Sequence, residues 1–386
     1  MLKEQTSSVS ALPPLSLYIH LPWCVHKCPY CDFNSHQADG GMDESSYLRA
    51  LQCDLESELD WLGGRELQSV FIGGGTPSLF SAEAIAELLQ HCRQLARFAR
   101  DAEITLEANP GTFEQEKFAA FRQAGVNRLS IGIQSFDGGH LQRLGRIHDE
   151  HEAHRAVEIA RQAGFDNINL DLMYALPGQS IEQAVRDVGI ACDKAVEHIS
   201  HYQLTIEPNT LFHKYPPAQP DSDVIWEMQQ ACQQRLAGHG YRQYEVSAWA
   251  QAGKRSRHNL NYWQFGDYIG IGAGAHGKLT HEQSITRRWK KRQPAEYMRE
   301  AMRGQALSGS EEIAADAIVF EFLLNALRLR EGVPMQTFVD HTGQSPAQLK
   351  QACRDIDPDL LLIDDKQVRA TDYGYRFIDD ILQRLL

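Results

Sequence analysis

The chain lacks any apolar run that approaches the roughly 20 residues a membrane-spanning helix needs. Its N-terminal segment, MLKEQTSSVSALPP, also lacks the apolar centre of a signal peptide. Neither a membrane-spanning nor a secreted protein is expected. The sequence therefore predicts a cytoplasmic location, where thiols stay reduced.

Positive charge is scarce as well. The 386 residues include 38 Lys and Arg against 51 Asp and Glu, which gives a formal net charge of −13. Such a balance disfavours broad electrostatic binding to nucleic acid. The hydrophobic fraction of 42% and the charged fraction of 23% are ordinary for a globular protein, and the length predicts two or three domains.

Cysteine is sparse and unevenly spread. Three of the eight cysteines fall between Cys24 and Cys31. The other five stand alone in helix-like stretches, where a cysteine is usually a small buried apolar residue: Cys53, Cys92, Cys192, Cys232 and Cys353. In a reducing compartment, a tight cluster indicates metal or redox chemistry rather than a disulfide framework.

Short apolar strands alternate with amphipathic helices from about residue 15 to 250. The expected strands are 15–21, 69–75, 103–110, 128–134, 167–174 and 201–207, and each is followed by a helix. Six such units predict a parallel α/β sheet with helical crossovers. Since eight units close a complete barrel, we expect an open, partial (β/α)6 barrel, with a doubly wound sheet as the alternative.

Candidate functional residues lie where these strands end, as they do in barrel enzymes. They were selected for their chemistry and not for this position. They follow or end the first five strands in turn: Cys24; Gly73, Gly74, Gly75 and Thr76; Glu107 and Asn109; Gln134; and Asp171.

The alternation of strands and helices ends after about residue 250. We divide the chain into a barrel over 1–250, a connecting segment rich in Gly and aromatics over 251–310, and a small domain over 311–386. Within the connecting segment, residues 255–278 are expected to be loop-like. The small domain is expected to be mostly helical, with a strand pair near LLLID and KQVRAT, and its order resembles a winged helix. Its acidic stretches disfavour a role in DNA binding.

Cys24, Cys28 and Cys31 supply three thiolates from one loop, in the spacing C-x-x-x-C-x-x-C. Soft thiolates suit zinc, copper(I) or iron–sulfur clusters. A structural zinc site needs a fourth ligand, and a nearby histidine would have to provide it: His20, His26 or His36. Three ligands on a four-iron cluster instead leave one iron open to a small molecule.

This spacing, with an aromatic residue (Tyr30) before the last cysteine, resembles the signature of the radical S-adenosylmethionine (SAM) superfamily. The resemblance implies a [4Fe–4S] cluster whose open iron is chelated by SAM. The motifs LYIHLPWC, GGGTPS, EANP, SIGIQSF, LGRIHD and DLMYALPGQ follow in order through residues 17–179. Together they resemble the branch that contains oxygen-independent coproporphyrinogen III oxidase.

The resemblance implies roles for five residues near the cluster. Gly74, Gly75 and Thr76 are expected to bring backbone close to the methionine part of SAM, which requires residues without bulk. Tyr18 and Tyr30 are expected to flank the cluster and SAM.

Four further residues are expected to bind the rest of SAM. The resemblance assigns Glu107 to the ribose or amino group, and Gln134 to the ribose. Arg146 would pair with the SAM carboxylate. Asp171 would make a polar contact near the ribose or adenine.

Two differences argue against coproporphyrinogen oxidation. The oxidase carries a fourth cysteine two residues after the third, whereas Phe33 stands there in this chain. The oxidase also has a longer segment before its cysteines, which helps to build its substrate site.

The segment His258-Asn-Leu-Asn-Tyr262-Trp263 matches an H-N-x-x-Y-W pattern and resembles the heme chaperones of this branch, the HemW group. The resemblance implies that His258 contacts heme, since imidazole is a common axial ligand. Tyr262 and Trp263 offer aromatic surface to a porphyrin. The basic run 287–292 could meet the heme propionates or simply form a solvated loop, and His276 is expected to be structural.

Three functions remain open from the sequence: a heme carrier, a porphyrinogen decarboxylase, and a radical enzyme acting on RNA. The carrier is favoured, with the cluster, SAM and heme as cofactors, an unidentified heme-acceptor protein as partner, no nucleic acid, and no catalytic residue assigned. A homodimer and transient contact with a membrane are compatible with the sequence.

Overall fold

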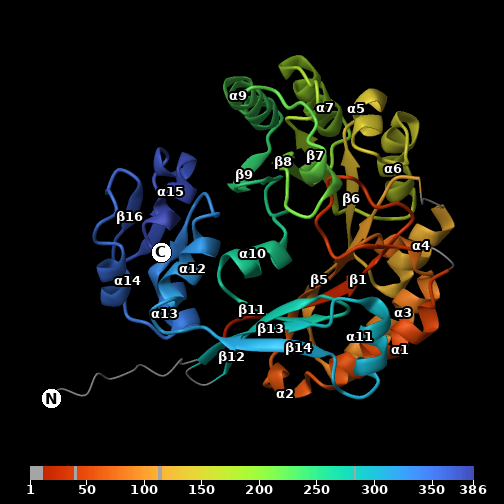
Figure 1. Ribbon diagram of the computed structural model, residues 1–386, viewed down its shortest axis with the longest axis horizontal. Helices are drawn as coiled ribbons and strands as arrows, with labels where there is room; N and C mark the ends of the chain where they lie inside the picture. Colours follow the sequence, from red (N-terminus) through yellow and green to blue (C-terminus); the bar gives the residue numbers. More distant parts are fainter. Residues whose placement is uncertain (1–11, 39–40, 112–114, 282–283) are drawn as a thin grey trace.

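The computed structural model describes residues 12–38, 41–111, 115–281 and 284–386. One curved sheet of 12 strands carries helices on its outer face, and a small C-terminal unit packs beside it (Figure 1). Within these ranges no helix combines the length and the apolar character of a membrane span. Residues 1–11, part of the segment expected to lack a signal peptide, lie outside the described residues.

Six parallel strands form the centre of the sheet. They are β1 (Leu15–Leu21), β4 (Leu67–Gly74), β5 (Phe98–Ala108), β6 (Arg128–Gln134), β7 (Ile168–Tyr174) and β8 (His198–Gln203). They lie side by side in chain order, each parallel to the next. A doubly wound sheet would reverse its order at a switch point. The uninterrupted order confirms the partial (β/α)6 barrel.

Helices connect the strands on the outside of the barrel. They are α1 (Glu44–Glu56), α2 (Leu59–Leu62), α3 (Ala82–Leu95), α4 (Gln115–Ala124), α5 (Gly138–Arg143), α6 (Glu150–Gln162), α7 (Ile181–Asp193), α8 (Leu211–Lys214) and α9 (Ser222–Gly238). Local sequence fixes their starts, since Ser81, Asp149 and Ser180 cap α3, α6 and α7 through their side chains. At the N-termini of α6 and α7 these caps are part of reciprocal capping boxes.

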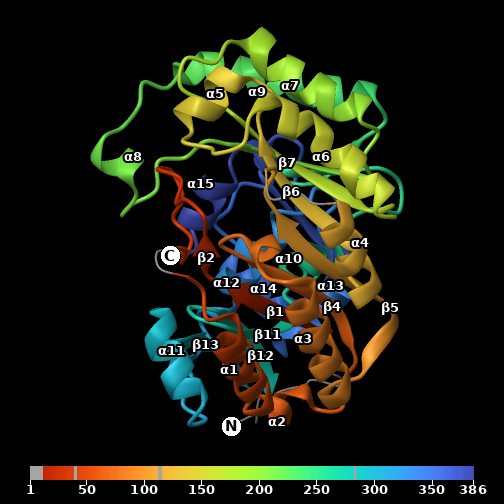
Figure 2. The same cartoon turned by 90° about the vertical axis from the view of Figure 1, so that its right-hand side faces the viewer.

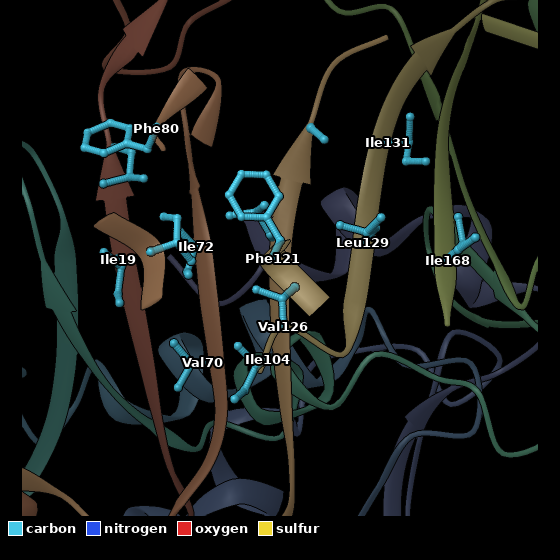
Figure 3. Close-up of a cluster of buried hydrophobic side chains, with 14 of the residues drawn as sticks. Ile19, Val70, Ile72, Phe80, Ile104, Phe121, Val126, Leu129, Ile131 and Ile168 are labelled. Atoms are coloured by element: carbon cyan, nitrogen blue, oxygen red, sulfur yellow. The ribbon is translucent and has the colours of Figure 1, made fainter. Parts of the chain in front are cut away.

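The core lies between the strands and these helices. Figure 3 shows Ile19, Ile72 and Leu129 of the strands in one cluster with Phe121 of α4, and all four are buried. Side chains alternate across each strand, so the neighbours of these core residues face the barrel interior. On β7, for example, Leu170 belongs to the core while the polar residues either side of it line the interior. The barrel therefore has a dry outer face and a polar inner one.

The expectation that residues 255–278 are loop-like is wrong. The connecting segment forms α10 (Arg257–Trp263), β11 (Asp267–Ile271), β12 (His276–His281), β13 (Ser284–Lys290), α11 (Pro294–Ala301) and β14 (Leu307–Glu312). β11 pairs with β1 in parallel, and β12 to β14 extend the sheet antiparallel. Gly270 permits this pairing, because a Cβ there would lie 1.9 Å from the His276 carbonyl oxygen.

At the opposite edge, β10 (Ala248–Ala250) pairs with β8, and β9 (Arg242–Glu245) pairs with β10. The C-terminal unit contains α12 (Ile318–Ala326), α13 (Met335–Thr342), α14 (Pro346–Ala352), α15 (Ile378–Gln383), β15 (Val333–Pro334), β16 (Leu361–Ile363) and β17 (Gln367–Ala370). The expected strand pair is β16–β17, which is antiparallel. Phe322 and Phe338 of this unit share one core with Tyr244 and Phe265, so the unit is packed onto the sheet.

Candidate functional site: a cysteine cavity and an aromatic groove

A cavity of about 490 Å³ opens at the carboxyl ends of the parallel strands, and all three clustered cysteines line it. We call it the cysteine cavity. Cys24 ends the short strand β2 (Trp23–Cys24), which pairs with β3 (His36–Gln37). The loop between these strands carries Cys28 and Cys31 and is closed by hydrogen bonds between backbone groups. The Cys31 N–H donates to the Cys28 carbonyl over 3.1 Å.

The donor set suits an iron–sulfur cluster. Cys28 Sγ lies 3.7 Å from Arg146 Nη1, and Cys31 Sγ lies 3.7 Å from Ser35 Oγ. Burial raises the pKa of the Cys24 and Cys31 thiols in the metal-free protein. Within the described ranges, no three His, Cys or acidic side chains converge as a single metal ion would require. Three soft thiolates on one loop match a cluster with one unligated iron better than a zinc ion.

The glycine segment after β4 packs directly against the cysteine loop. A Cβ on Gly75 would lie 2.5 Å from the Trp23 carbonyl oxygen, and Gly74 has a φ of +125°. The Gly75 N–H donates to the Leu21 carbonyl over 2.8 Å, and the Thr76 N–H donates to Trp23 over 2.7 Å. Only residues without a side chain permit this approach. The glycines therefore hold the cysteine loop at the rim of the cavity that they also line.

Arg146 brings a half-buried positive charge beside the thiols. Its Nη2 donates to Asn109 Oδ1 over 2.7 Å and to the Gly132 carbonyl over 2.8 Å. Its Nε is buried without a hydrogen-bond partner, and no carboxylate of the described residues pairs with the guanidinium. A half-buried cation of this kind is stabilised by an anionic group. Both a cluster and a carboxylate-bearing ligand would supply one.

Gln134, at the end of β6, is held in a strained conformation. Its φ of +67° is left-handed, which costs a non-glycine residue about 1 kcal/mol or more. Its Oε1 accepts a hydrogen bond of 2.7 Å from the Tyr202 hydroxyl. Tyr202 lines the cavity, and the sequence reasoning missed it. The alternation of side chains along β8 could have predicted it, because Ser200 and Tyr202 are two residues apart and share the inner face.

Two carboxyl groups share the barrel interior. Burial, and then the charge of Asp171, raises the pKa of Glu107 to about 8, although the Gly74 N–H donates to Glu107 Oε2 over 3.0 Å. Burial also raises the pKa of Asp171, which accepts hydrogen bonds from Asn169 and Ser130. Glu107 is therefore largely protonated at neutral pH and can donate a hydrogen bond.

A second hollow, of about 860 Å³, lies beside the cysteine cavity, and we call it the aromatic groove. Six aromatic side chains contribute to its wall: Tyr18, Phe33, Tyr262, Trp263, Tyr268 and Trp289. The groove and the cavity have four lining residues in common: Asp32, Phe33, Gly74 and Glu107. The two hollows therefore adjoin each other along these four residues.

The two tyrosines expected to flank the cluster line different hollows. Tyr30 lines the cysteine cavity and packs near Phe212 of α8, with ring centroids 6.3 Å apart. Figure 2 shows α8 on a loop that extends beyond the barrel helices. Tyr18 lines the aromatic groove instead, and its hydroxyl lies 2.9 Å from His20 Nδ1. The parity of β1 places Tyr18 and His20 together on the inner face.

His258 lies beneath the groove and not in it. Its Nδ1 lies 2.9 Å from Ser69 Oγ, and its Nε2 lies 3.1 Å from the Tyr262 hydroxyl. The ring stacks on Phe71 at 5.0 Å. Burial, and then the charge of Arg128, lowers the pKa of His258 to about 3. In this arrangement neither ring nitrogen is open to a metal, although the following Tyr262 and Trp263 reach the groove.

The sequence allowed two interpretations of the basic run 287–292, and one of them, a solvated loop, is wrong. Most of the run lies on β13. Four of its five cations pair with carboxylates: Arg287 with Glu321, Arg288 with Glu58, Lys290 with Asp54 and Glu58, and Lys291 with Glu296. Arg292 has no carboxylate partner among the described residues and lines the aromatic groove.

Comparison with known proteins agrees with this architecture. Residues 18–188 match the family model of the Radical SAM superfamily, and residues 313–377 match the HemN C-terminal domain. The solved structure of coproporphyrinogen III oxidase (HemN) from Escherichia coli superposes with a TM-score of 0.82, covering 99% of this chain and 92% of that one. Sequence identity is only 21%, so this likeness shows the fold alone.

Curated relatives are far closer in sequence. The heme chaperone HemW of Haemophilus influenzae is 48% identical over 97% of this chain and 98% of its own length. The heme chaperone HemW of Escherichia coli K12 is 50% identical over 86% of this chain and 87% of its own. These relatives do not favour the porphyrinogen decarboxylase considered from the sequence. The chain belongs to the HemW family of heme chaperones within the radical SAM superfamily.

Proposed function

We propose that this protein binds heme and passes it to an acceptor protein, and that it carries a [4Fe–4S] cluster and SAM beside the heme. The observation that carries the proposal is the nearly full-length similarity to heme chaperones in a chain that gathers three cysteines in one cavity. We place this activity in the cytoplasm, and a homodimer is compatible with it.

We assign the cluster to Cys24, Cys28 and Cys31. When bound, such a cluster supplies an electron to SAM at the iron that the protein leaves open. The chain's own contribution is to hold the loop that carries the thiols. Backbone hydrogen bonds from Gly75 and Thr76 do this at the rim of the cavity.

We assign SAM to the remaining polar lining of the cysteine cavity. Arg146 would pair with its carboxylate, since its half-buried guanidinium has no acidic partner among the described residues. Glu107, protonated at neutral pH, would donate to the ribose or to another acceptor. Gln134 and Asp171 would orient the ribose or adenine, and Tyr30 would cover the cluster side.

We assign a different role to each of the three parts of the chain. The barrel would hold the cluster and SAM, the segment 251–310 would complete the sheet and form one side of the aromatic groove, and 311–386 would pack against it as a separate unit. The contacts of Tyr262, Trp263 and Trp289 with the groove support the role of the middle segment.

An anaerobic hemin titration of the reconstituted protein tests the proposal. We expect the absorbance change to saturate at one heme per chain. Addition of excess apomyoglobin to the loaded protein should then transfer the heme, which a shift of the Soret band would report. Weak uptake that never saturates would contradict the proposal, as would heme that cannot be released.

A further inference from the structure

The walls of the aromatic groove are fixed by their own packing. Tyr262 of α10 meets Tyr268 of β11 edge to face, with centroids 4.3 Å apart. Trp289 of β13 lies over Gly309 of β14, where a Cβ would come within 2.4 Å of the indole ring. Rigid aromatic surfaces bind a flat apolar ligand at a low cost in conformational entropy.

Three histidines lie in or at the edge of this groove, and two of them are fully engaged. His20 Nδ1 lies 2.9 Å from the Tyr18 hydroxyl, and its Nε2 lies 3.0 Å from the Asn34 carbonyl oxygen. His258 has both nitrogens engaged by Ser69 and Tyr262. Neither ring can bind a metal without breaking a buried hydrogen bond, which costs roughly 1–3 kcal/mol.

His276 is the third histidine, and it differs from the other two. It begins β12, is exposed and lines the groove. In the antiparallel register it stands directly opposite Trp289, so the two side chains share one face of the sheet. No hydrogen bond or ion pair of its ring is found in the described part of the chain.

The charges of the groove are also arranged for one orientation of an anionic ligand. Arg292 is exposed, without a carboxylate partner in the described ranges, and lines the groove beside His276. Its backbone is anchored, because Asn34 Nδ2 donates to the carbonyl oxygens of Arg292 and Ala273 over 2.8 Å each. Asp32, on the wall toward the cysteine cavity, would repel a carboxylate.

We infer that the aromatic groove is the heme site, with His276 as the axial ligand of the iron and Arg292 as the partner of a propionate. This assignment rests on the proposed function. The porphyrin would lie against Tyr262, Tyr268 and Trp289. His258 is a positioning residue in this arrangement, since its hydrogen bond holds the Tyr262 hydroxyl from below.

Phe33 lies between the aromatic groove and the cysteine cavity. Its side chain is 58% exposed and lines both hollows, at the position where the oxidase has a cysteine. A bulky apolar ring there widens the apolar surface of the groove and gives no fourth thiol to the cysteine loop. Heme in the groove would therefore lie next to the cluster without sharing a ligand with it.

Hemin titrations of four proteins test this inference: wild type, His276→Ala, His258→Ala and His281→Ala. His281 is the control, because it is the exposed histidine at the other end of β12. We expect His276→Ala to shift the Soret band and to weaken hemin binding on the order of tenfold or more. Added imidazole should restore the wild-type spectrum. His258→Ala should weaken binding without moving the Soret band, and His281→Ala should match wild type.

A second pair of titrations tests Arg292. We expect Arg292→Ala to weaken binding of hemin and to leave binding of the hemin dimethyl ester unchanged, because the ester has no propionate charge. The inference is overturned if wild type binds one hemin per chain and His276→Ala has the same spectrum and affinity. It is also overturned if the spectral shift follows His258→Ala instead. Failure of wild type to bind hemin would overturn the proposed function, and the site with it.

Discussion

The cysteine cavity and the aromatic groove lie against one sheet but have different linings. The cavity lies inside the parallel strands, where Asp171 accepts a hydrogen bond from Asn169 and Tyr202 donates one to Gln134. The groove reaches from β1 onto the antiparallel strands β12 and β13, and much of its wall is aromatic. The cavity is thus suited to a small polar ligand and the groove to a flat apolar one. The contrast shows how one barrel can present a polar lining and an aromatic lining side by side.

Substitution of the three clustered cysteines should have the largest effect, and it should affect the cysteine cavity alone. We expect Cys24→Ser, Cys28→Ser and Cys31→Ser each to abolish the iron–sulfur absorbance after anaerobic reconstitution, because a three-thiolate site has no substitute ligand. Cys92→Ser, at an isolated buried cysteine, is the matched control and should keep the cluster. Full iron and sulfide content in all three loop variants would refute the cluster assignment.

Arg146→Lys should act on the cavity alone. Lysine keeps the charge but cannot reproduce the two hydrogen bonds to Asn109 and Gly132 while facing a ligand carboxylate. We expect SAM binding, measured by calorimetry on the reconstituted protein, to weaken on the order of tenfold, with hemin binding unchanged. Arg143→Lys, at an exposed arginine on α5, is the control. An equal loss of hemin affinity would show that the two hollows are not independent.

Gly75→Ala should distort the rim of the cysteine cavity. The added Cβ would meet the Trp23 backbone at 2.5 Å, so the cysteine loop must shift. We expect a loss of about 1–3 kcal/mol in the free energy of unfolding, seen in denaturant melts of the metal-free protein. Gly238→Ala, at the end of α9 with open space around its Cβ, should be neutral or slightly stabilising. Equal melts for the two variants would contradict the close approach.

Glu107→Gln should have an effect that is confined to the pH dependence of stability. The folded wild type keeps its proton up to a pKa of about 8, whereas an unfolded glutamate releases it near pH 4.3. The folded state therefore binds more protons between these values, and stability falls as pH rises through that window. We expect Glu107→Gln to reduce the fall between pH 5 and 8 by about 1–3 kcal/mol in metal-free protein. Parallel pH profiles for the two proteins would contradict the buried, protonated carboxyl.

Much of the barrel could be predicted from the sequence because burial alone produces its pattern. The strand predicted over 15–21 is β1 as observed, and the predicted strand pair of the C-terminal unit is β16–β17. The cavity residues were found for a related reason. In a parallel sheet, residues at strand ends meet at one edge, so Glu107, Gln134 and Asp171 converge although they are far apart in sequence.

The aromatic groove could not be predicted, because its geometry depends on long-range pairing. β11 pairs with β1, about 250 residues earlier in the chain, and this pairing places it in the sheet. The sequence favoured His258 as the heme ligand and His276 as a structural residue. In the structure Ser69 and Phe71 of β4 bury His258, while β12 carries His276 to the groove. Neither environment can be predicted from the residues next to His258 or His276 in the sequence.

The central claim is that heme has a site of its own beside the cluster, and a competition experiment tests it most directly. Hemin would be titrated into the triple variant Cys24→Ser/Cys28→Ser/Cys31→Ser, and into reconstituted wild type with and without saturating SAM. We predict one hemin per chain, with the same Soret band, in all three cases. Loss of hemin binding together with the cluster, or displacement of hemin by SAM, would contradict the claim and place heme in the cysteine cavity.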